Sequence, residues 1–414
     1  MYDQPDGVPT HGQTYRIYAS HFEDIQGRGA QPGTTYCHEP CWPATGTPDF
    51  GSRLQPYALY VPDKPAPPQG YGMTLNLHYC GGNYTEGPPD AQALADRATG
   101  SVVVTPEDRG GCYWYWSEAG ADTFEAWADV ARHFHLDPGY NAISGWSMGG
   151  YGTYKLAAEF PDLFAVALPD IGCVSAETGW PGEPTPSISG EDAEILNLAP
   201  SYRNIPFLMA NAGADQFCLN PGQNQVLNEF EQLGYRFDWR EYDSDHGPYY
   251  PTNAESAAFL GDQTVNPNPP HVTWVDDGGM QEPRWGLTSN HVYWLSGIAI
   301  RDAAINNDLG KVDALSNGFG LADPAVNPPV PESGTGSLDP QGVPYTFTGL
   351  KETWQSPARE PATDELDLKL TNISNVTVNL ARARLNCHVK VNVTSDGPAT
   401  VQLAGCDRTI QVNG

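Results

Sequence analysis

Hydrophobic and polar positions follow two different periods along residues 55–262. Some short runs are apolar and β-branched, which is typical of strands buried on both faces of a parallel sheet, and others repeat apolar residues at helical spacing. The expected strands are 57–61, Met73–His78, Ser101–Thr105, Asn141–Ser144, Leu163–Leu168, Pro206–Asn211 and Tyr235–Tyr242. The expected helices are Ala121–Phe134, Tyr151–Phe160 and Asn224–Leu233. This alternation predicts an α/β domain with a mostly parallel sheet flanked by helices.

The pattern changes after residue 262, where the Pro-rich run 267–270 indicates a linker. Beyond it, short runs alternate apolar and polar residues between Gly, Pro and Asn, which predicts an all-β, sandwich-like region. The strand-like runs are 272–275, 292–300, 345–348, 366–370, 376–380, 389–393 and 400–403, with a loop expected at Asp323–Pro340. We therefore divide the chain into an N-terminal extension (1–54, with one strand-like run at Thr14–Tyr18), an α/β domain (55–262) and a β-rich C-terminal domain (263–414).

The motif that carries most chemical information is Gly145–Gly149, which reads Gly-Trp-Ser-Met-Gly. It matches G-x-S-x-G, and it lies between an expected strand and an expected helix. Glycines at such a turn allow a sharp bend that holds the central serine exposed and strained. The motif therefore predicts that Ser147 is a nucleophile.

A serine hydroxyl is a weak nucleophile and needs a base, and the base needs an orienting carboxylate. After the strand 206–211 comes Asp215, and after the last strand comes His246. Both should lie at the carboxyl edge of the sheet, where ligands bind in open α/β folds. We predict a triad of Ser147, His246 and Asp215. Three other acids remain as alternatives to Asp215, namely Asp170, Asp243 and Asp245.

The same chemistry needs two backbone N–H groups that face the developing oxyanion. One should come from Met148, directly after the nucleophile. The other should come from the loop His78–Gly82, which resembles the HGGG-type run with Tyr and Cys in place of two glycines. Tyr79 or Cys80 is the expected donor there.

These features together resemble the α/β-hydrolase family over roughly residues 55–260. The stretch from Phe124 to Pro161 is similar to secreted bacterial serine esterases and prolyl-oligopeptidase-like hydrolases, and Gly-Trp-Ser-Met-Gly-Gly is similar to the elbow of cutinase-like polyester hydrolases. The resemblance implies acyl transfer through an acyl-enzyme at Ser147. It implies no metal and no organic cofactor.

Composition and charge narrow the partners. The chain has 414 residues with 50 acidic and 21 basic side chains, a formal charge of −29. Such a surface would be repelled by nucleic acid and by anionic membranes. Polar residues follow Met1 without a basic or apolar leader, so we interpret the sequence as the mature form of a secreted protein.

Eight cysteines, an even number, are also typical of a secreted protein. Eight cysteines allow 105 connectivities. Position in the hydrolase fold that the resemblance implies favours four pairs, which are Cys37 with Cys41, Cys80 with Cys112, Cys173 with Cys218, and Cys387 with Cys406. The second and third of these pairs would stiffen loops around the expected site.

Aromatic residues gather near the expected site and suggest an aromatic or extended apolar acyl group. The expected substrate-binding residues are Trp146, Tyr113, Trp114, Trp116, Phe217 and Tyr249. Core packing is the alternative role for the run 113–116.

We predict a secreted serine esterase that acts on carboxylic esters, with aromatic or polymeric esters (a polyester or a plant cell-wall ester) as the favoured class. A prolyl-oligopeptidase-like peptidase is one alternative; against it, 54 residues before the catalytic domain are too few for the gating propeller of such enzymes. The other is a carbohydrate- or surface-binding protein that uses its C-terminal β region.

Overall fold

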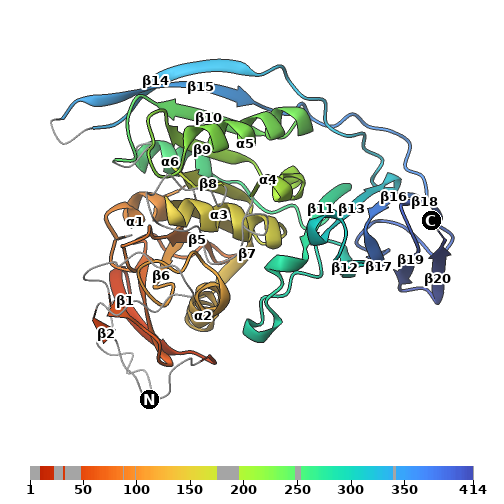
Figure 1. Ribbon diagram of the computed structural model, residues 1–414, viewed down its shortest axis with the longest axis horizontal. Helices are drawn as coiled ribbons and strands as arrows, with labels where there is room; N and C mark the ends of the chain where they lie inside the picture. The colour runs from red at the N-terminus through yellow and green to blue at the C-terminus, as the bar shows by residue number, and fades with distance from the viewer. Residues whose placement is uncertain are drawn as a thin grey trace.

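The computed structural model describes residues 10–22, 31–32, 48–86, 88–97, 99–174, 195–247, 253–338 and 342–413. Its largest feature is a ten-stranded sheet (Figure 1). The strands are β1 (Gly12–Ala19), β4 (Leu54–Val61), β5 (Tyr71–Leu77), β6 (Ser101–Pro106), β7 (Leu136–Trp146), β8 (Val166–Asp170), β9 (Phe207–Ala212), β10 (Phe237–Tyr242), β14 (Val330–Leu338) and β15 (Pro344–Glu352). Their order is β1-β4-β6-β5-β7-β8-β9-β10-β15-β14.

The six central strands, β6-β5-β7-β8-β9-β10, are parallel, and the outer strands on both sides are antiparallel. From β5 the chain first crosses to β6 on one side, and then returns to β7 on the other side of β5. The direction of winding therefore reverses at β5 and β7. In open α/β sheets such a reversal leaves a crevice at the carboxyl ends of the strands, which is where ligands bind.

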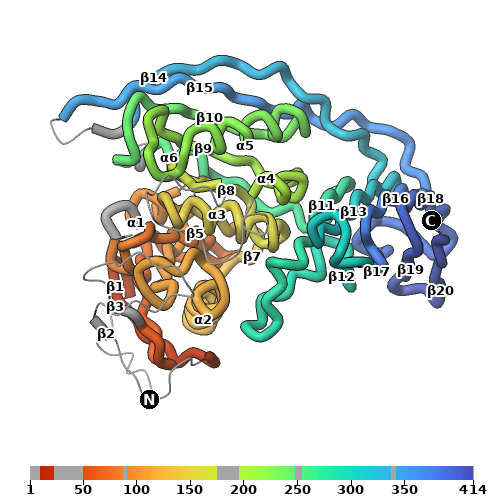
Figure 2. The backbone as a smooth tube through the Cα atoms, in the orientation of Figure 1, coloured from red at the N-terminus to blue at the C-terminus, as the bar shows by residue number. Residues whose placement is uncertain are grey.

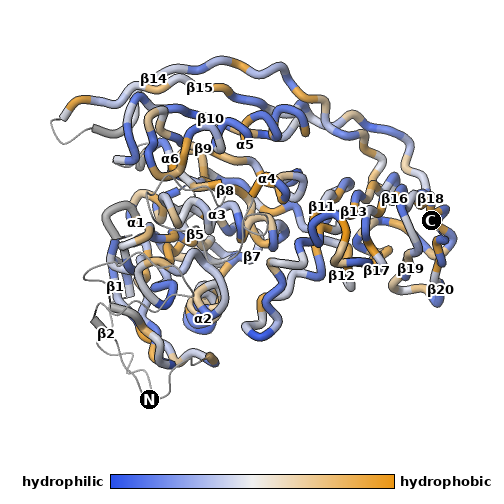
Figure 3. The backbone as a smooth tube through the Cα atoms, in the orientation of Figure 1, coloured by the Kyte–Doolittle hydropathy of each residue, from blue (hydrophilic) through white to orange (hydrophobic). Residues whose placement is uncertain are grey.

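Helices cover both faces of this sheet. On one face lie α1 (Pro88–Ala95) and α6 (Asn253–Leu260), and on the other lie α2 (Ser117–His133), α3 (Met148–Glu159), the short α4 (Ile195–Leu198) and α5 (Asn220–Leu233). Because strand side chains alternate, Val103 packs with α1 whereas Val102 and Val104 pack with α2 and α3. Hydrophobic residues accordingly concentrate along the central strands (Figure 3). No helix in these described ranges is long and apolar enough to cross a membrane.

The C-terminal region contains two four-stranded sheets. One has the order β11 (His271–Asp277), β13 (Leu309–Ser316), β16 (Glu365–Thr371) and β18 (Lys390–Ser395); the other has β12 (Leu295–Ile300), β17 (Ile373–Asn379), β19 (Ala399–Ala404) and β20 (Arg408–Val412). Residues from both sheets share one core, which includes Trp274, Leu368 and Val376. Trp274 and Trp294 are each only 1% exposed, so neither indole is available to stack on a sugar.

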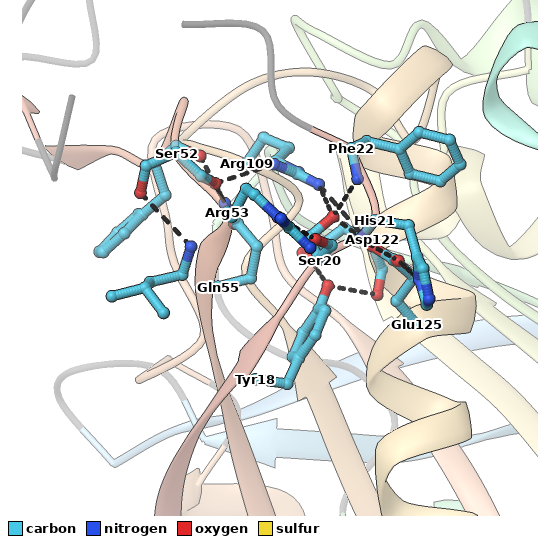
Figure 4. Close-up of polar contacts among 12 residues, drawn as sticks. Tyr18, Ser20, His21, Phe22, Ser52, Arg53, Gln55, Arg109, Asp122 and Glu125 are labelled. Atoms are coloured by element: carbon cyan, nitrogen blue, oxygen red, sulfur yellow. Dashed lines mark hydrogen bonds and ion pairs between the residues drawn. The ribbon is translucent and has the colours of Figure 1, made fainter. Parts of the chain in front are cut away.

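A buried polar cluster fastens β1 to α2 (Figure 4). The hydroxyl of Tyr18 donates to the carboxylate of Asp122, and the hydroxyl of Ser20 donates to Glu125. Arg109 lies 3.8 Å from Glu125 and donates to Ser20. Burial raises the pKa of Asp122 to about 6, although the Arg109 charge opposes the shift. The strand predicted at 14–18 is therefore part of the large sheet, as its edge strand β1, and Tyr18 is its buried anchor.

All seven strands and all three helices predicted in 55–262 are present with shifted ends, but α1 and α6 are absent from the prediction. The loop predicted at Asp323–Pro340 is wrong, since most of its second half forms β14. Gly334 and Gly336 on this edge strand leave room for the rings of Phe347 and Tyr242, so glycine serves packing there rather than a turn.

The hairpin β14–β15 runs along β10 from the direction of the C-terminal sheets, as the tube shows (Figure 2). It belongs to the range 263–414, and β1 belongs to 1–54. The boundaries at 55 and 262 stay a prediction, but the large sheet takes strands from both sides of them.

Candidate active site

Ser147 lies in the turn between β7 and α3. Its backbone has φ 57° and ψ −112°, a conformation that costs a non-glycine residue about 1–3 kcal/mol. Its N–H donates to the carbonyl of Asp170 at the end of the neighbouring strand, at 2.9 Å. This bond holds the strained turn against the sheet. The sharp, strained strand-to-helix turn predicted from the motif is therefore present, with Ser147 at its centre.

A close approach to β5 explains the glycine two residues after Ser147. A Cβ on Gly149 would collide with the carbonyl oxygen of Leu77, the last residue of β5. Only glycine lets the first turn of α3 sit this close to the loop that follows β5. The helix N-terminus, whose first N–H groups lack intrahelical partners, is thus brought next to that loop.

Ser147, His246 and Asp215 form one chain of hydrogen bonds. The Nε2 atom of His246 lies 2.8 Å from Oγ of Ser147, and its Nδ1 lies 2.8 Å from Oδ2 of Asp215. All three residues are less than 9% exposed. An acceptor at Nδ1 orients the imidazole so that Nε2 can take the serine proton. The three residues chosen from strand order are therefore adjacent in the structure.

The second carboxylate oxygen of Asp215 also accepts hydrogen bonds. Oδ1 accepts the backbone N–H of Phe217 at 2.8 Å and that of Cys218 at 2.9 Å. The alternative acids are not the ones bonded to His246 Nδ1: the backbone carbonyl of the buried Asp170 accepts the N–H of Ser147, and the exposed Asp245 accepts the N–H of Gly247. Asp243, also exposed, is bonded through its backbone to Thr346. The carboxylate that faces His246 is that of Asp215.

The loop after β5 narrows the choice of a second oxyanion donor. The N–H of Gly81 donates to Gly111 at 2.7 Å, and that of Gly82 donates to Tyr79 at 2.9 Å. These two amides are therefore already used. Tyr79 and Cys80 remain the expected donors beside Met148, whose N–H starts α3. The assignment of these three as the oxyanion hole stays a prediction.

Two buried residues that support this loop were not singled out from the sequence. The ring of His78 lies 2.9 Å from the carbonyl oxygens of both Tyr79 and Glu107, so it bridges the loops after β5 and β6. Burial lowers the pKa of His78. The hydroxyl of Tyr115 donates to the carbonyl of His78 at 2.9 Å. The position of His78 at the end of an expected strand and the start of the expected oxyanion loop was the available signal.

Aromatic rings surround His246. The Trp146 ring lies 5.3 Å from the imidazole at an interplanar angle of 31°, and the Phe217 ring meets it edge-on at 5.0 Å. Tyr79 in turn packs edge-on against Trp146 at 4.7 Å. Trp146 and Phe217, both expected to bind substrate, are thus next to the reacting groups and are half-buried.

The other expected substrate-binding rings lie in different surroundings. Trp116 is 4% exposed and lies in the main core, where Nζ of Lys155 sits 4.2 Å above its ring. Trp114 packs edge-on against Tyr151, a fully buried residue of α3. Core packing therefore accounts for these two tryptophans. Tyr113 is half-buried. Tyr249 lies outside the described residues.

Three of the four expected disulfides are present. Cys80–Cys112 joins the loop after β5 to the loop after β6, and Cys173–Cys218 joins the loop after β8 to the acid loop. Cys387–Cys406 joins two turns of the C-terminal region. The fourth pair, Cys37 with Cys41, lies outside the described residues.

Within the described ranges, one group of residues has the spacing of a metal site. Ligand atoms of Asp215, Cys218 and His246 lie within 4.8 Å of one another. The sulfur of Cys218 is bonded to Cys173, so it offers no thiolate, which is the form that binds metals. The group is therefore better described as the serine–histidine–aspartate constellation itself.

The sequence profile of the prolyl oligopeptidase family matches residues 97–185. This segment includes α2, β7 and the elbow with Ser147, but neither Asp215 nor His246. The resemblance to α/β-hydrolases stated from the sequence is thereby confirmed. No curated protein sequence matches the chain.

Several solved structures are similar in fold. The fluorophosphonate-binding serine hydrolase FphF of Staphylococcus aureus is 15% identical, with a TM-score of 0.41 over 60% of this chain and 94% of that one. An S-formylglutathione hydrolase from Agrobacterium tumefaciens is 18% identical, with a TM-score of 0.41 over 52% and 95%. Dipeptidyl peptidase 4 of Porphyromonas gingivalis is 20% identical, with a TM-score of 0.39 over 52% and 34%. Likenesses of this size say nothing about the substrate.

Proposed function

We propose that this protein is a secreted serine hydrolase that cleaves carboxylic esters through Ser147, His246 and Asp215. The observation that carries the proposal is the pair of 2.8 Å hydrogen bonds that link these three side chains at the carboxyl edge of the sheet. A serine in a strained turn, a base on its hydroxyl and a carboxylate behind the base are the three parts that acyl transfer requires.

In this mechanism, Oγ of Ser147 attacks the ester carbonyl while its proton passes to Nε2 of His246. Asp215 stabilises the imidazolium that forms. The carbonyl oxygen becomes an oxyanion facing the N–H of Met148 and that of Tyr79 or Cys80. His246 then returns the proton to the departing alcohol as the C–O bond breaks. A water molecule, deprotonated by His246, attacks the acyl-serine and releases the acid.

The match to the prolyl oligopeptidase profile supports a second candidate, a serine peptidase. The two reactions differ in the leaving group, because an amide nitrogen must be protonated before it departs whereas an ester oxygen is a better leaving group. An ester is therefore the less demanding substrate for this relay. The matched segment ends before the acid and the histidine, so the profile bears on the elbow rather than on the leaving-group side.

Rings near the reacting groups support an aromatic or extended apolar acyl group, in a small ester or within a polymer. Trp146 and Phe217 flank the imidazole, and Tyr79 packs on Trp146. Such rings bury apolar surface with defined geometry. Among the rings predicted from the sequence, these are the ones that support this substrate class.

Secretion is supported by the three disulfides, because disulfides form and persist in oxidising compartments. Thiol titration of the denatured, unreduced protein tests this part. Few or no reactive thiols are expected after expression through a secretory route, and a full set of free thiols in active protein would contradict it.

The activity is tested with wild type, Ser147→Ala and a matched control, Ser296→Ala, whose hydroxyl lies on an exposed position of β12. The panel contains nitrophenyl esters of increasing chain length, feruloyl and terephthaloyl esters, and Xaa-Pro anilides. Ester turnover lost in Ser147→Ala and kept in Ser296→Ala is the expected result. Anilide turnover without ester preference would favour the peptidase. Turnover that survives in Ser147→Ala would reject both candidates.

A further inference from the structure

We propose that the hairpin β14–β15 is a positioning element for His246, so that a segment of the C-terminal region is part of the catalytic scaffold. Its strands cover residues 330–338 and 344–352, and β15 lies alongside β10, the strand that leads to His246 (Figure 2). As a statement about catalysis it rests on the proposed function, but its geometry stands independently of the substrate.

The backbone of β15 follows β10 to its end and beyond. Pairing runs from Phe237 opposite Glu352 to Tyr242 opposite Phe347. It continues into the next loop, where the N–H of Asp243 donates to the carbonyl of Thr346 at 2.9 Å. His246 comes three residues later. Without the hairpin, β10 would be the edge of the sheet, with its outer N–H and C=O groups unpaired.

Residues of the hairpin pack against Tyr242, the last residue of β10. Tyr242 is fully buried, and its ring lies 5.2 Å from that of Phe347. On β14, the backbone of Gly336 contacts the same ring. A Cβ at this position would collide with Cε1 of Tyr242 and would lie 2.9 Å from its hydroxyl oxygen. The position of the Tyr242 ring is therefore set by the hairpin on this side.

The Tyr242 ring also belongs to the surroundings of Ser147. It shares a small apolar cluster with Ile171, which follows β8, and with Phe347. Trp146, the neighbour of Ser147, packs against this cluster, and so does Tyr345 of the hairpin. Movement of the hairpin would thus be transmitted to both ends of the Ser147–His246 pair.

The loop that carries His246 is held from two sides. On one side are the acid loop contacts, from the N–H of Ala214 to the carbonyl of Ser244 at 2.9 Å and from the N–H of His246 to Oε1 of Gln216 at 3.3 Å. On the other side is the bond from Asp243 to the hairpin. Loosening one of the two sides should displace the imidazole, and a displacement of about 1 Å can cost on the order of 100-fold in rate.

Ion pairs attach the base of the hairpin to β10. Nζ of Lys351 lies 3.1 Å from the carboxylate of Asp238, which is 2% exposed and also pairs with Arg240 at 3.0 Å. The guanidinium of Arg240 in turn lies 4.9 Å above the Phe347 ring. The hairpin is therefore anchored at its base and closely packed near its tip, as a positioning element must be.

The test uses the full chain with Gly336→Ala, which pushes a methyl group against the Tyr242 ring. We expect kcat on the best ester to fall by roughly 10- to 100-fold with KM within about twofold, because the base is displaced while the binding residues remain. The matched control is Thr335→Ala, an exposed neighbour on the same strand, which should behave as wild type. Thermal unfolding checks that both variants are folded.

A double-mutant cycle separates positioning from general damage. Tyr242→Ala removes the ring that the new methyl group would meet, so Gly336→Ala should add no further loss in that background.

If Gly336→Ala does not fold, Phe347→Leu replaces it. This variant removes one ring contact and keeps the apolar volume, and about a 3- to 10-fold loss of kcat is expected. Additive losses in the cycle, or wild-type kcat in a folded Gly336→Ala or Phe347→Leu variant, would overturn the proposal.

A spectroscopic readout keeps this test independent of the substrate. The imidazole Nδ1–H of His246, hydrogen-bonded to Asp215, should give a downfield proton resonance that Asp215→Asn removes. We expect Gly336→Ala, or Phe347→Leu in its place, to shift or broaden that resonance and Thr335→Ala to leave it in place. An unmoved resonance would reject the hairpin proposal even if esters are turned over. A shifted resonance without ester turnover in wild type would reject the proposed function alone.

Discussion

The backbone N–H of Cys218 donates to Oδ1 of Asp215 at 2.9 Å, while the sulfur of Cys218 is bonded to Cys173. The carboxylate that faces His246 is therefore hydrogen-bonded, through its other oxygen, to a residue that a disulfide links to the loop after β8. Preorganisation of this kind matters because a catalytic group must be held within a fraction of an ångström of its working position.

This relationship predicts the effect of removing the Cys173–Cys218 disulfide. The Cys173→Ser/Cys218→Ser variant should lose about 2–5 kcal/mol of unfolding free energy, and its kcat should fall on the order of 10-fold because the acid loop is loosened. The matched control removes Cys387–Cys406, which joins two turns of the C-terminal region. That variant should lose stability but keep kcat. Equal kcat losses in both variants, measured well below their melting temperatures, would show that the effect is not local.

The choice of Asp215 over the other acids is tested by three single substitutions. Asp215→Asn keeps the shape of the side chain but can leave the imidazole in the wrong tautomer, so kcat should fall by roughly 10³- to 10⁴-fold with KM little changed. Asp170→Asn and Asp245→Asn should each retain most of the activity, because His246 Nδ1 bonds to Asp215. Steady-state kinetics on one nitrophenyl ester suffice. A larger loss in Asp170→Asn than in Asp215→Asn would reassign the acid.

The first turn of α3 gives a steric prediction. Gly149→Ala would place a methyl group against the carbonyl of Leu77, so the helix and the loop after β5 must move apart. We expect activity to drop by about 100-fold or more, together with a lower melting temperature. Gly139→Ala is the control, since its Cβ would approach only the Asp137 side chain, at 3.3 Å. Near-normal activity in Gly149→Ala would mean that the spacing between α3 and β5 is not critical.

The elements that could be predicted from the sequence are those with local signals. The central strands carry continuous apolar runs such as Ser101–Thr105, and the elbow, Asp215 and His246 each follow a strand end, so strand order alone placed them at one edge. The parallel arrangement of the strands predicts that these residues lie near one another, but only the structure gives the distances between them.

The parts that could not be predicted depend on long-range packing. The sequence of β14 is rich in Gly and Ser and carries no apolar alternation, so its pattern predicts a loop. It becomes a strand because Phe347, on the other strand of the hairpin, and Tyr242, distant in sequence, fill the space above its glycines. The tryptophans of the run 113–116 are a second example. Their position after a strand predicts that they line the site, but Trp116 is buried in the main core.

Trp146 should determine selectivity between small and bulky esters. Trp146→Ala removes a ring next to Ser147, so kcat/KM on feruloyl or terephthaloyl esters should fall by roughly 10- to 100-fold, and that on acetate by less. Trp285→Ala is a suitable control because its ring packs on Phe22 instead. The measurement is the ratio of kcat/KM values for the two esters. An unchanged ratio would count against an aromatic-lined acyl site.

A pH-dependent contact joins the C-terminal region to the catalytic body. His271, at the start of β11, lies 2.8 Å from Asp323 and 3.1 Å from Asp313, and Asp323 also pairs with Arg203 at 2.8 Å. Burial acts to lower the pKa of His271 and Arg203 opposes its protonation, but the two carboxylates outweigh both and raise it above its ordinary value of 6.5.

The sign of the pH effect follows from this shift. A histidine whose pKa is higher in the folded state stabilises the fold fully below its unfolded pKa of 6.5, and that stabilisation is lost as pH rises through the folded pKa. The same pairing lowers the pKa of Asp323 to about 2, so this carboxylate stays charged throughout the window. Melting temperature should therefore fall as pH rises from about 6 to about 8.5. In His271→Gln the slope should be flatter, and in His388→Gln, an exposed histidine of the same region, it should match wild type. Identical slopes in wild type and His271→Gln would mean that this contact contributes nothing to the pH dependence.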